Sequence, residues 1–592
     1  MARKIISGIP VSVGIAIGRA YLLNRGHYCL APVQSISENL VEQEIDRLRE
    51  AFQKALEGLH ALRSTVPQEQ TEHAAIIDSH IMILEDPKLR DSTERYIRQM
   101  RLNAEWALEK GVAEIEDRFK AIEDDYFRSR VDEVRLLSQR VMNHLLGNHD
   151  EIKPITSRVI LLAHDLTPAD TVEFDVSKIM AFATAHGGKT SHVSILARTL
   201  EIPAVVGVEE LEQSVHDNDY IIVDGFHGQI VIAPDDSEVL EYSKLLSKFE
   251  AYQSEVMHYR HLPAETQDGY RVRLYANIEL FEEVSAVIDN AGEGIGLYRT
   301  EYSYMHRSEL PTEQELFEEY RDLGSIVHPN RVIIRTLDAG GDKVGRGMED
   351  LEEQNPALGL RAVRFCLRYR DVFKTQLRAI LRAGEVGNIS LMFPMISGAS
   401  ELREIKWVLQ EVKEELDREG IEYSRDIPVG IMMELPSAVM IADILAKEVD
   451  FFSVGTNDLI QYSLGIDRTN KYVSHLYQPL HPALLRSIKH VVDAGHRAGI
   501  EVSMCGEMAS DPYCLPVLVG MQVDSLSLNP QSIPGIKRVL RQLTMEECYA
   551  TLKQVLSSDS VTSNNRLIRE SIFRKFPEEF MFYASMLENE QE

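Results

Sequence analysis

The stretch VGIMMELPSAVMIADILAKEVDFFSVGTND, Val429 to Asp458, contains a strand, a helix and a second strand in direct succession. Its two ends, VGIMM and FFSV, are short apolar runs of the length and composition of buried strands, and each is followed at once by polar residues. The sequence between them is helical in character. A strand, a helix and a strand form the repeating unit of an α/β fold with a parallel sheet.

The same unit repeats throughout the C-terminal half of the chain. Eight strand-like runs, each followed by helical sequence, occupy about 300 residues, a number and length typical of a (β/α)8 barrel, or TIM barrel. We predict this barrel over residues 265–575, followed by a tail at 576–592; a doubly wound open sheet is the alternative. The runs are VRLYANI, GIGLYRTE, VIIRTLD, ISLMFPM, VGIMME, FFSVGTND, EVSMCGE and DSLSLN.

Polar side chains at the carboxyl ends of these strands are the candidate site, because TIM barrels carry their active sites at that face. Arginine forks bind carboxylate or phosphate, and Glu434 and Asp458 offer hard oxygen ligands for Mg²⁺. We therefore predict a pocket for a small polyanion and a metal; structural ion pairs are the alternative. The candidates are Asn277, Arg299, Arg335, Asp338, Glu434, Asn457, Asp458 and Cys505, with Arg468 in the loop after the sixth strand.

Cys505 ends the seventh strand, in the motif MCGEMA. A lone cysteine at the end of a buried strand is most often a small core residue. Beside a cationic pocket, however, nearby positive charge would tune its ionisation, and its thiol could exchange a proton with a substrate carbon. Both interpretations stay open on the residues alone.

The N-terminal half has a different texture. The runs VILLA, IMAFAT, IPAVVG and YIIVDG are strand-like, and we predict an α/β unit of residues 1–29 and 148–235 whose sheet includes the opening strands. A helical module over 30–147 is inserted in it, with a capping box at Ser35 and Glu38 and further helical stretches at 71–86, 88–122 and 130–146. Residues 236–264 are predicted as a linker helix.

The motif GGKTSHVSILAR, Gly187 to Arg198, places His192 at the start of a predicted helix. Its glycines permit a tight turn, and the helix start offers free N–H groups to a phosphate. A neutral imidazole is a nucleophile near neutral pH, and the phosphoryl group that it takes is readily passed on. The sequence therefore predicts a reversible phosphoryl carrier at His192; a merely capping histidine is the alternative, and His186 is at most accessory.

Composition excludes several classes of protein. The formal net charge of −30 and the lack of a basic block argue against a nucleic-acid partner. No apolar run approaches the roughly 20 residues of a membrane span, so no anchor is expected. The five cysteines are scattered without CxxC spacing, which fits a reducing cytoplasm.

Taken together, these motifs resemble the enzyme I family of the bacterial phosphoenolpyruvate-dependent sugar phosphotransferase system. GGKTSHVSILAR resembles the family's phosphohistidine signature, and GLYRTE, DAGGDK, IMMELPSA, FFSVGTNDLIQYSLGIDR and MCGEMA resemble its phosphoenolpyruvate-site motifs. The likeness covers nearly the whole chain. It implies an enzyme that transfers the phosphoryl group of phosphoenolpyruvate to its own histidine and then to the phosphocarrier protein HPr, releasing pyruvate.

The resemblance also implies a role for each candidate. His192 would be phosphorylated, Cys505 would be the proton donor, and Glu434 and Asp458 would bind Mg²⁺. It further implies HPr binding by the helical module 30–147 and a homodimer formed through the barrel. A nitrogen-related regulatory phosphotransferase and a phosphoenolpyruvate synthase or dikinase are the alternative functions. The implied substrate contacts are Arg299, Arg335, Asn457, Asp458 and Arg468.

Overall fold

The fold is known from a computed structural model of the whole chain, which forms two compact units, Met1–Phe249 and Glu250–Glu592. None of the helices among the described residues is long and apolar enough to cross a membrane. The structure describes residues 3–23, 34–65, 71–120, 134–135, 137–138, 140–146, 155, 157–164, 166, 176–188, 192–200, 202–305, 310–340, 355–468, 470 and 472–576.

The second unit contains the predicted barrel. All eight predicted strands form, and each pairs in parallel with its neighbours until β16 closes on β9, which excludes the open-sheet alternative. Parallel pairing directs every carboxyl end to one mouth of the barrel. The strands are β9 (Arg273–Ile278), β10 (Gly294–Arg299), β11 (Arg331–Arg335), β12 (Ile389–Phe393), β13 (Val429–Met433), β14 (Phe451–Val454), β15 (Glu501–Met504) and β16 (Ser525–Leu528).

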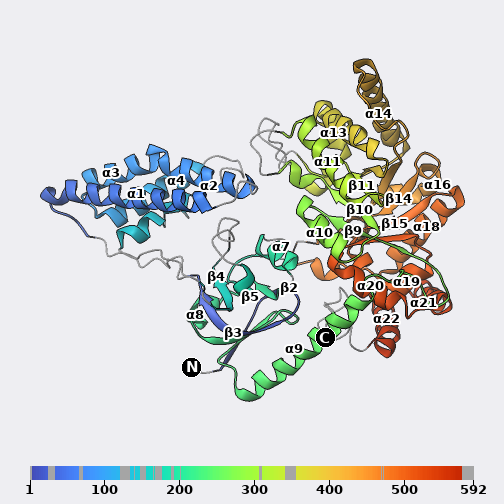
Figure 1. Cartoon of the computed structure of the whole chain (residues 1–592), viewed down its shortest axis with the longest axis horizontal. Helices are drawn as coiled ribbons and strands as arrows, with labels where there is room; N and C mark the ends of the chain where they lie inside the picture. The colour runs from blue at the N-terminus through green and yellow to red at the C-terminus, as the bar shows by residue number, and fades with distance from the viewer. Residues whose placement is uncertain are drawn as a thin grey trace. The chain divides into compact units, whose positions relative to one another are not determined.

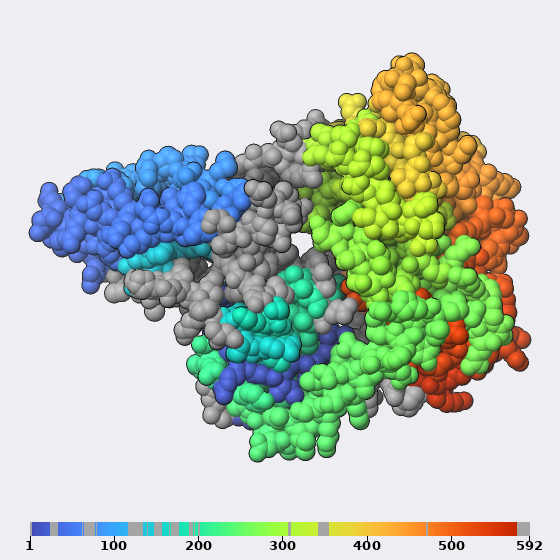
Figure 2. Space-filling model, in the orientation of Figure 1, coloured from blue at the N-terminus to red at the C-terminus, as the bar shows by residue number. Residues whose placement is uncertain are grey.

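Helices surround the strands on the outside (Figure 1), and in Figure 2 their side chains fill the spaces between the ribbons. The main apolar core of the unit lies between the strands and these helices. The helices are α10 (Val284–Asp289), α11 (Glu313–Val327), α12 (Val363–Arg368), α13 (Arg370–Ala383), α14 (Ala399–Glu419), α15 (Pro436–Met440), α16 (Ala442–Leu445), α17 (Thr456–Leu464), α18 (Pro482–Ala498), α19 (Leu515–Gly520), α20 (Ile533–Leu540), α21 (Met545–Ser557) and α22 (Val561–Lys575).

A second, smaller apolar cluster fills the inside of the barrel and includes the ring of Phe451. Gly430, on the neighbouring strand β13, makes room for that ring, since a Cβ there would lie 2.3 Å from it. Arg331, at the amino end of β11, lies over the same ring at 4.3 Å and pairs with Glu501 at 3.0 Å. Packing and this ion pair therefore occupy the amino end of the barrel, and the candidate site residues lie at the other.

The first unit contains the predicted α/β sheet, in the strand order β1-β8-β7-β3-β4-β5-β6-β2. The opening strands pair with later ones, β1 with β8 and β3 with β7 and β4, which confirms that they join this sheet. Two helices accompany the strands, α7 (His192–Thr199) and α8 (Leu211–Ser214). The strands are β1 (Lys4–Ser7), β2 (Ile9–Ser12), β3 (Ile15–Leu22), β4 (Val159–Ala163), β5 (Ile179–Thr184), β6 (Ala204–Val206), β7 (Tyr220–Asp224) and β8 (Gln229–Ile232).

Most of the described residues between β3 and β4 are helical, as predicted, and they have their own apolar core. Within the predicted stretch 130–146, the described residues 134–135, 137–138 and 140–145 are helical. The helices with full bounds are α1 (Val41–Thr65), α2 (Thr71–Glu85), α3 (Pro87–Met100) and α4 (Ala104–Lys120).

Two details of this part were predicted wrongly. The stretch 88–122 is two helices, because Arg101 adopts a left-handed conformation (φ 51°) and Leu102 then pairs with Ser35 in an isolated β-bridge. That bridge also removes Ser35 from the predicted capping box, so that Ser37 precedes a short 3₁₀ helix and α1 begins at Val41. Both differences arise from a contact between segments far apart in sequence.

The predicted linker helix forms as α9 (Asp236–His258). In the first unit, Phe249 packs edge-on against Phe226, with ring centroids 5.1 Å apart. In the second unit, Arg538 of α20 pairs with Glu255 at 3.3 Å and lies over the ring of Tyr252. Each unit therefore packs against its own part of this helix.

Asp224 closes the turn between β7 and β8 and gives a testable pH dependence. The buried carboxylate accepts hydrogen bonds from the backbone of Phe226 (2.9 Å) and from the backbone (3.1 Å) and Nδ1 (2.8 Å) of His227. Burial alone would raise the pKa of Asp224, but the bonds from His227 and Phe226 outweigh it and hold the pKa below its ordinary value. The carboxylate therefore stabilises the folded unit above the unfolded pKa of about 4, and that contribution disappears as the pH falls through the lower folded pKa.

We expect Asp224→Asn to lower the free energy of unfolding at pH 7 by about 1–3 kcal/mol, the usual cost of a lost buried charge-assisted hydrogen bond. The difference from the native protein should shrink as the pH is lowered from 5 to 3. Urea denaturation across this range measures it, with Asp46→Asn, an exposed carboxylate of α1, as the control. An Asp224→Asn difference that is independent of pH would contradict the assignment.

Candidate functional site at the barrel mouth

The predicted polar residues meet at the carboxyl ends of the barrel strands. Arg299 and Arg335 are the last residues of β10 and β11, and Glu434 and Cys505 directly follow β13 and β15. Asp458 lies in the first turn of α17, which begins right after β14. Because all these strands point the same way, residues more than two hundred positions apart in sequence lie around one opening.

Three carboxylates form the centre of this site. Asp338, Glu434 and Asp458 each place an oxygen within 4.8 Å of the other two. Glu434 is 1% exposed; its Oε1 accepts a hydrogen bond from the backbone of Met395 at 2.5 Å, and its Oε2 has no hydrogen-bond partner in the described part of the chain. Gly455 permits this arrangement, since a Cβ there would lie 3.0 Å from Oε2.

This arrangement fits a divalent cation. Burial raises the pKa of Glu434 to about 8, and the neighbouring Asp458 and Asp338 add to the effect. The repulsion among these three carboxylates is costly without a compensating positive charge. Clustered carboxylate oxygens are also the ligands that Mg²⁺ prefers. Glu434 and Asp458 were the predicted ligands. The structure adds Asp338, which the sequence placed among the strand-end candidates without a metal role.

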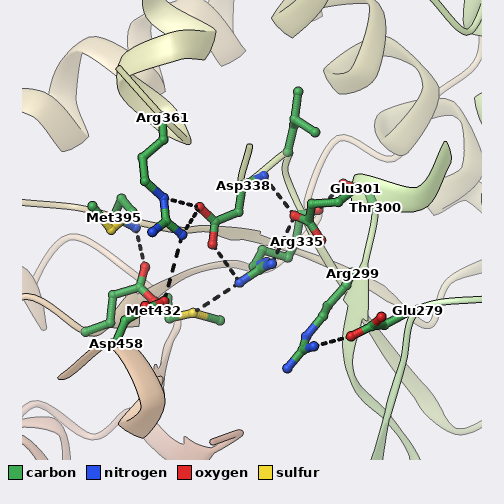
Figure 3. A network of polar contacts seen from close by, with 12 residues as sticks. Glu279, Arg299, Thr300, Glu301, Arg335, Asp338, Arg361, Met395, Met432 and Asp458 are labelled. Atoms are coloured by element: carbon green, nitrogen blue, oxygen red, sulfur yellow. Dashed lines mark hydrogen bonds and ion pairs between the residues drawn. The ribbon is translucent and has the colours of Figure 1, made fainter. Parts of the chain in front are cut away.

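Arg335 holds the cluster from one side (Figure 3). Its Nη1 pairs with Asp338 and its Nη2 with Glu301, both at 2.9 Å, while Nε is buried without a hydrogen-bond partner among the described residues. Burial by itself would lower the pKa of this guanidinium, but Glu301, Asp338 and Glu434 outweigh it and raise the pKa above its ordinary value. Arg335 therefore stays charged in the buried site.

Arg361 holds the same cluster from the other side, and sequence reasoning missed it. Its Nε and Nη2 contact Asp338 Oδ1 at 3.1 and 2.8 Å, and Nη2 lies 3.9 Å from Asp458. Arg361 does not end a strand, so the strand-end rule could not find it. It returns to the site through an isolated β-bridge to Gly340, after a segment whose residues 341–354 lie outside the described part. Figure 3 shows its guanidinium directed at Asp338 and Asp458.

The remaining predicted substrate contacts are engaged with other carboxylates. Arg299 pairs with Glu279, away from the three carboxylates (Figure 3). Arg468 pairs with Glu507 at 3.4 Å, and the backbone of Glu507 donates to the side-chain oxygen of Asn457 at 2.9 Å. The structure thus shows one group around Asp338 and a second around Glu507.

Cys505 is 3% exposed and belongs to the cluster inside the barrel. Burial raises the pKa of its thiol to about 11, with Glu434 adding to the rise; Arg335 and Arg299 lower it by less. Positive charge does act on this cysteine, as predicted, but burial dominates. The group is therefore a thiol at neutral pH, the form that can donate a proton. Cys366, Cys514 and Cys548 are also buried, and Cys29 lies outside the described residues.

His192 begins α7, as the sequence predicts, although its side chain and residues 189–191 lie outside the described part. Gly187 has φ 115°, a conformation that favours glycine, and the hydroxyl of Ser194 donates to the carbonyl of Gly188 at 2.7 Å. The turn is thus fastened to the first turn of the helix. The nearby His186 is exposed, and its ring centroid lies 4.3 Å from that of His164.

Comparison with known proteins covers almost the whole chain. Three family profiles match it: "PEP-utilising enzyme, N-terminal" over residues 7–130, "PEP-utilising enzyme, mobile domain" over 155–228 and "PEP-utilising enzyme, PEP-binding domain" over 253–545. The phosphoenolpyruvate-protein phosphotransferase of Geobacillus stearothermophilus is 43% identical over 94% of this chain and 96% of its own length. That of Priestia megaterium is 40% identical over 94% and 97%.

Among solved structures, a solution structure of Enzyme I (nEIt) matches with 32% identity. It covers 41% of this chain and 99% of its own, with a TM-score of 0.35.

Proposed function

The chain belongs to the phosphoenolpyruvate-protein phosphotransferase family, and from this premise we propose that His192 takes the phosphoryl group of phosphoenolpyruvate and passes it to the phosphocarrier protein HPr. Pyruvate is the other product. The cluster of Asp338, Glu434 and Asp458, of which Glu434 is buried and the other two are partly buried, is flanked by Arg335 and Arg361 and supports this proposal most directly. A trianionic substrate needs such a concentration of cationic groups, and a divalent metal needs such oxygens.

In the proposed site, Arg299, Arg335, Asn457 and Arg468 bind phosphoenolpyruvate. Guanidinium forks match both of its anionic groups, carboxylate and phosphate. Arg335 is the buried member, and its Nε, which has no hydrogen-bond partner among the described residues, is the proposed contact for the substrate. Arg299 and Arg468 must exchange their present partners, Glu279 and Glu507, for the ligand. Both of these glutamates are at least half exposed, so releasing them to water is easy.

Mg²⁺ is the proposed cofactor, held by Glu434 and Asp458 with Asp338 beside them. When bound, it supplies positive charge that offsets the charge on the transferring phosphoryl oxygens. The remaining chemistry falls to the chain itself. The imidazole of His192 attacks phosphorus while the bond from phosphorus to the enol oxygen breaks. The arginines hold the substrate in line and stabilise the enolate that leaves.

Cys505 is the proposed donor of the proton that converts this enolate to pyruvate. A thiol whose pKa is about 11 keeps its proton until a strong carbon base is present. His192 belongs to the other compact unit. Since one imidazole must contact first phosphoenolpyruvate and then HPr, we infer that the α/β unit moves during turnover.

We propose that the helical module 30–147 binds HPr and that the barrel forms the contact of a homodimer. The proposed location of the protein is the cytoplasm. Met440 and Ile444, on the neighbouring helices α15 and α16, are 76% and 44% exposed, and apolar side chains of this kind are often covered by self-association. Sedimentation of the whole chain, alone and with HPr, tests whether both partners bind, because each association adds a separate mass.

The function itself is tested by incubating the purified chain with phosphoenolpyruvate and Mg²⁺ in the absence of nucleotide. We expect an intact-mass increase of one phosphoryl group, an equivalent amount of pyruvate, and loss of the adduct when HPr is added. Chelation of the metal with EDTA is the control and should prevent the adduct. A correctly folded protein that forms neither adduct nor pyruvate would rule the proposal out.

A further inference from the structure

Asn277 lies near the carboxyl end of β9, and its side-chain amide contacts the backbone carbonyl of Cys505, the proposed proton donor. Its Nδ2 donates to the carbonyl of Cys505 at 2.9 Å and to the carbonyl of Ser527 at 3.0 Å. Its Oδ1 is buried without a hydrogen-bond partner among the described residues. A side chain of β9 thus binds the carboxyl ends of two strands, its neighbour β16 and the next strand, β15.

This contact replaces a missing part of the sheet. The register between β15 and β16 ends at Met504 and Leu526, so the carbonyl of Cys505 lies beyond the last pair. A buried carbonyl without a donor would cost free energy. Asn277 supplies the donor, and it ties Cys505 to Ser527 where the backbone ladder has stopped.

On its other side, Cys505 is held by β14. Its backbone N–H donates to the carbonyl of Val454 at 3.1 Å, and its sulfur lies 3.7 Å from the same oxygen. The next residue, Gly506, passes so close to Thr456 that a Cβ would lie 1.8 Å from the threonine hydroxyl. β14 and Thr456 fix one side of Cys505. The hydrogen bonds of Asn277 on the other side therefore determine where the thiol lies.

We propose that Asn277 is a positioning residue for proton transfer from Cys505 to the substrate. This inference rests on the proposed function. In the step, the S–H bond of Cys505 breaks, its proton forms a C–H bond with the electron pair at C3 of the enolate, and the thiolate regains a proton from water. A thiol held in one place delivers the proton to one face of C3. A thiol that moves leaves protonation to water, which reaches both faces.

The experiment follows the stereochemistry of protonation in Asn277→Leu, a variant of similar volume without the donor. Phosphoenolpyruvate carrying one deuterium and one tritium at C3 is turned over in ordinary water with HPr as acceptor, and the chirality of the pyruvate methyl group is measured. We expect the stereochemical excess to fall by at least about twofold, as it should in Cys505→Ala, while His192 is still phosphorylated. Asn277→Ser serves the same purpose should the leucine variant not fold.

Asn388 offers a matched control. Its Nδ2 also binds two backbone carbonyls, those of Gly324 (2.9 Å) and Asn330 (2.7 Å), and its Oδ1 is also buried without a partner among the described residues. It precedes β12, however, at the amino end of the barrel. Asn388→Leu should therefore lose comparable stability and keep the stereochemical excess.

The outcomes separate the two ideas. An unchanged excess in Asn277→Leu, with a loss in Cys505→Ala, would overturn the inference and leave the function intact. An unchanged excess in Cys505→Ala would remove the proposed donor itself. An equal loss in Asn277→Leu and Asn388→Leu would show that general destabilisation is the cause, and would also overturn the inference.

Discussion

Replacement of His192 by alanine should abolish phosphorylation of the chain by phosphoenolpyruvate. The proposed nucleophile is the imidazole, and removing the nucleophile of a covalent mechanism lowers the rate by at least about a thousandfold. No adduct should be seen by intact mass after an incubation that converts the native protein completely. The variant should fold normally, because the backbone of residue 192 begins α7 and alanine is a good helix former.

The same variant should still bind phosphoenolpyruvate. The proposed substrate site lies in the barrel unit, whereas His192 lies in the other compact unit, so binding and phosphorylation should be separable. A thermal shift on adding phosphoenolpyruvate and Mg²⁺, equal in His192→Ala and native protein, would demonstrate this. His186→Ala is the matched control in the same turn and should be phosphorylated normally. If His192→Ala still formed an adduct and His186→Ala did not, His186 would be the phosphoryl carrier.

Replacement of Glu434 by glutamine should have the next largest effect. We expect it to lower activity and, in the absence of metal, to raise stability. Glutamine keeps the hydrogen bond from Met395 but removes the charge that the proposed Mg²⁺ requires. We expect kcat/KM for phosphoenolpyruvate to fall by at least about a hundredfold, the loss typical of removing one group that stabilises transition-state charge. Without metal, the variant should be more stable than the native protein, because residue 434 then has no ionisable group whose charge burial, Asp338 and Asp458 oppose.

The metal itself supplies a second measurement. The native protein should show a rise in Tm when Mg²⁺ is added, and Glu434→Gln should not. The control is Glu411→Gln, which removes a partly exposed carboxylate paired with Lys374 on the outside of the barrel unit. A Glu434→Gln variant with native activity and a native response to Mg²⁺ would exclude this residue as a ligand.

The architecture could be predicted from sequence because it depends on local patterns. Each barrel strand is a short apolar run followed by a polar residue, and eight such runs with helices between them leave few alternatives. The same reasoning joined the opening strands to a sheet formed by residues beyond 158. It failed at residues 101–103, where pairing with residues 34–36 ends α3 and separates it from α4. No periodicity within 88–122 reveals that contact.

The candidate site divides in the same way. Residues that end or directly follow a strand, such as Arg335 and Glu434, were found because their position relative to an apolar run is visible in the sequence. Arg361 was missed because it reaches Asp338 from a segment before α12. Glu301 and Gln376 were missed as well: Glu301 binds Arg335, and the buried Gln376 binds the backbone of Leu337 at 3.0 Å. Their partners lie on other elements, so nothing in their own neighbourhood marks them.

The sequence by itself determined the fold class, the family and the chemical types of the site, because apolar periodicity and motif order are properties of the chain. The tertiary structure alone decided how these groups act on one another. Asp338 joins Glu434 and Asp458 within 4.8 Å, and burial raises the pKa of Cys505 despite two nearby arginines. Charge interactions and desolvation depend on distance and on exclusion of water, and both arise only when distant segments are folded around one barrel mouth.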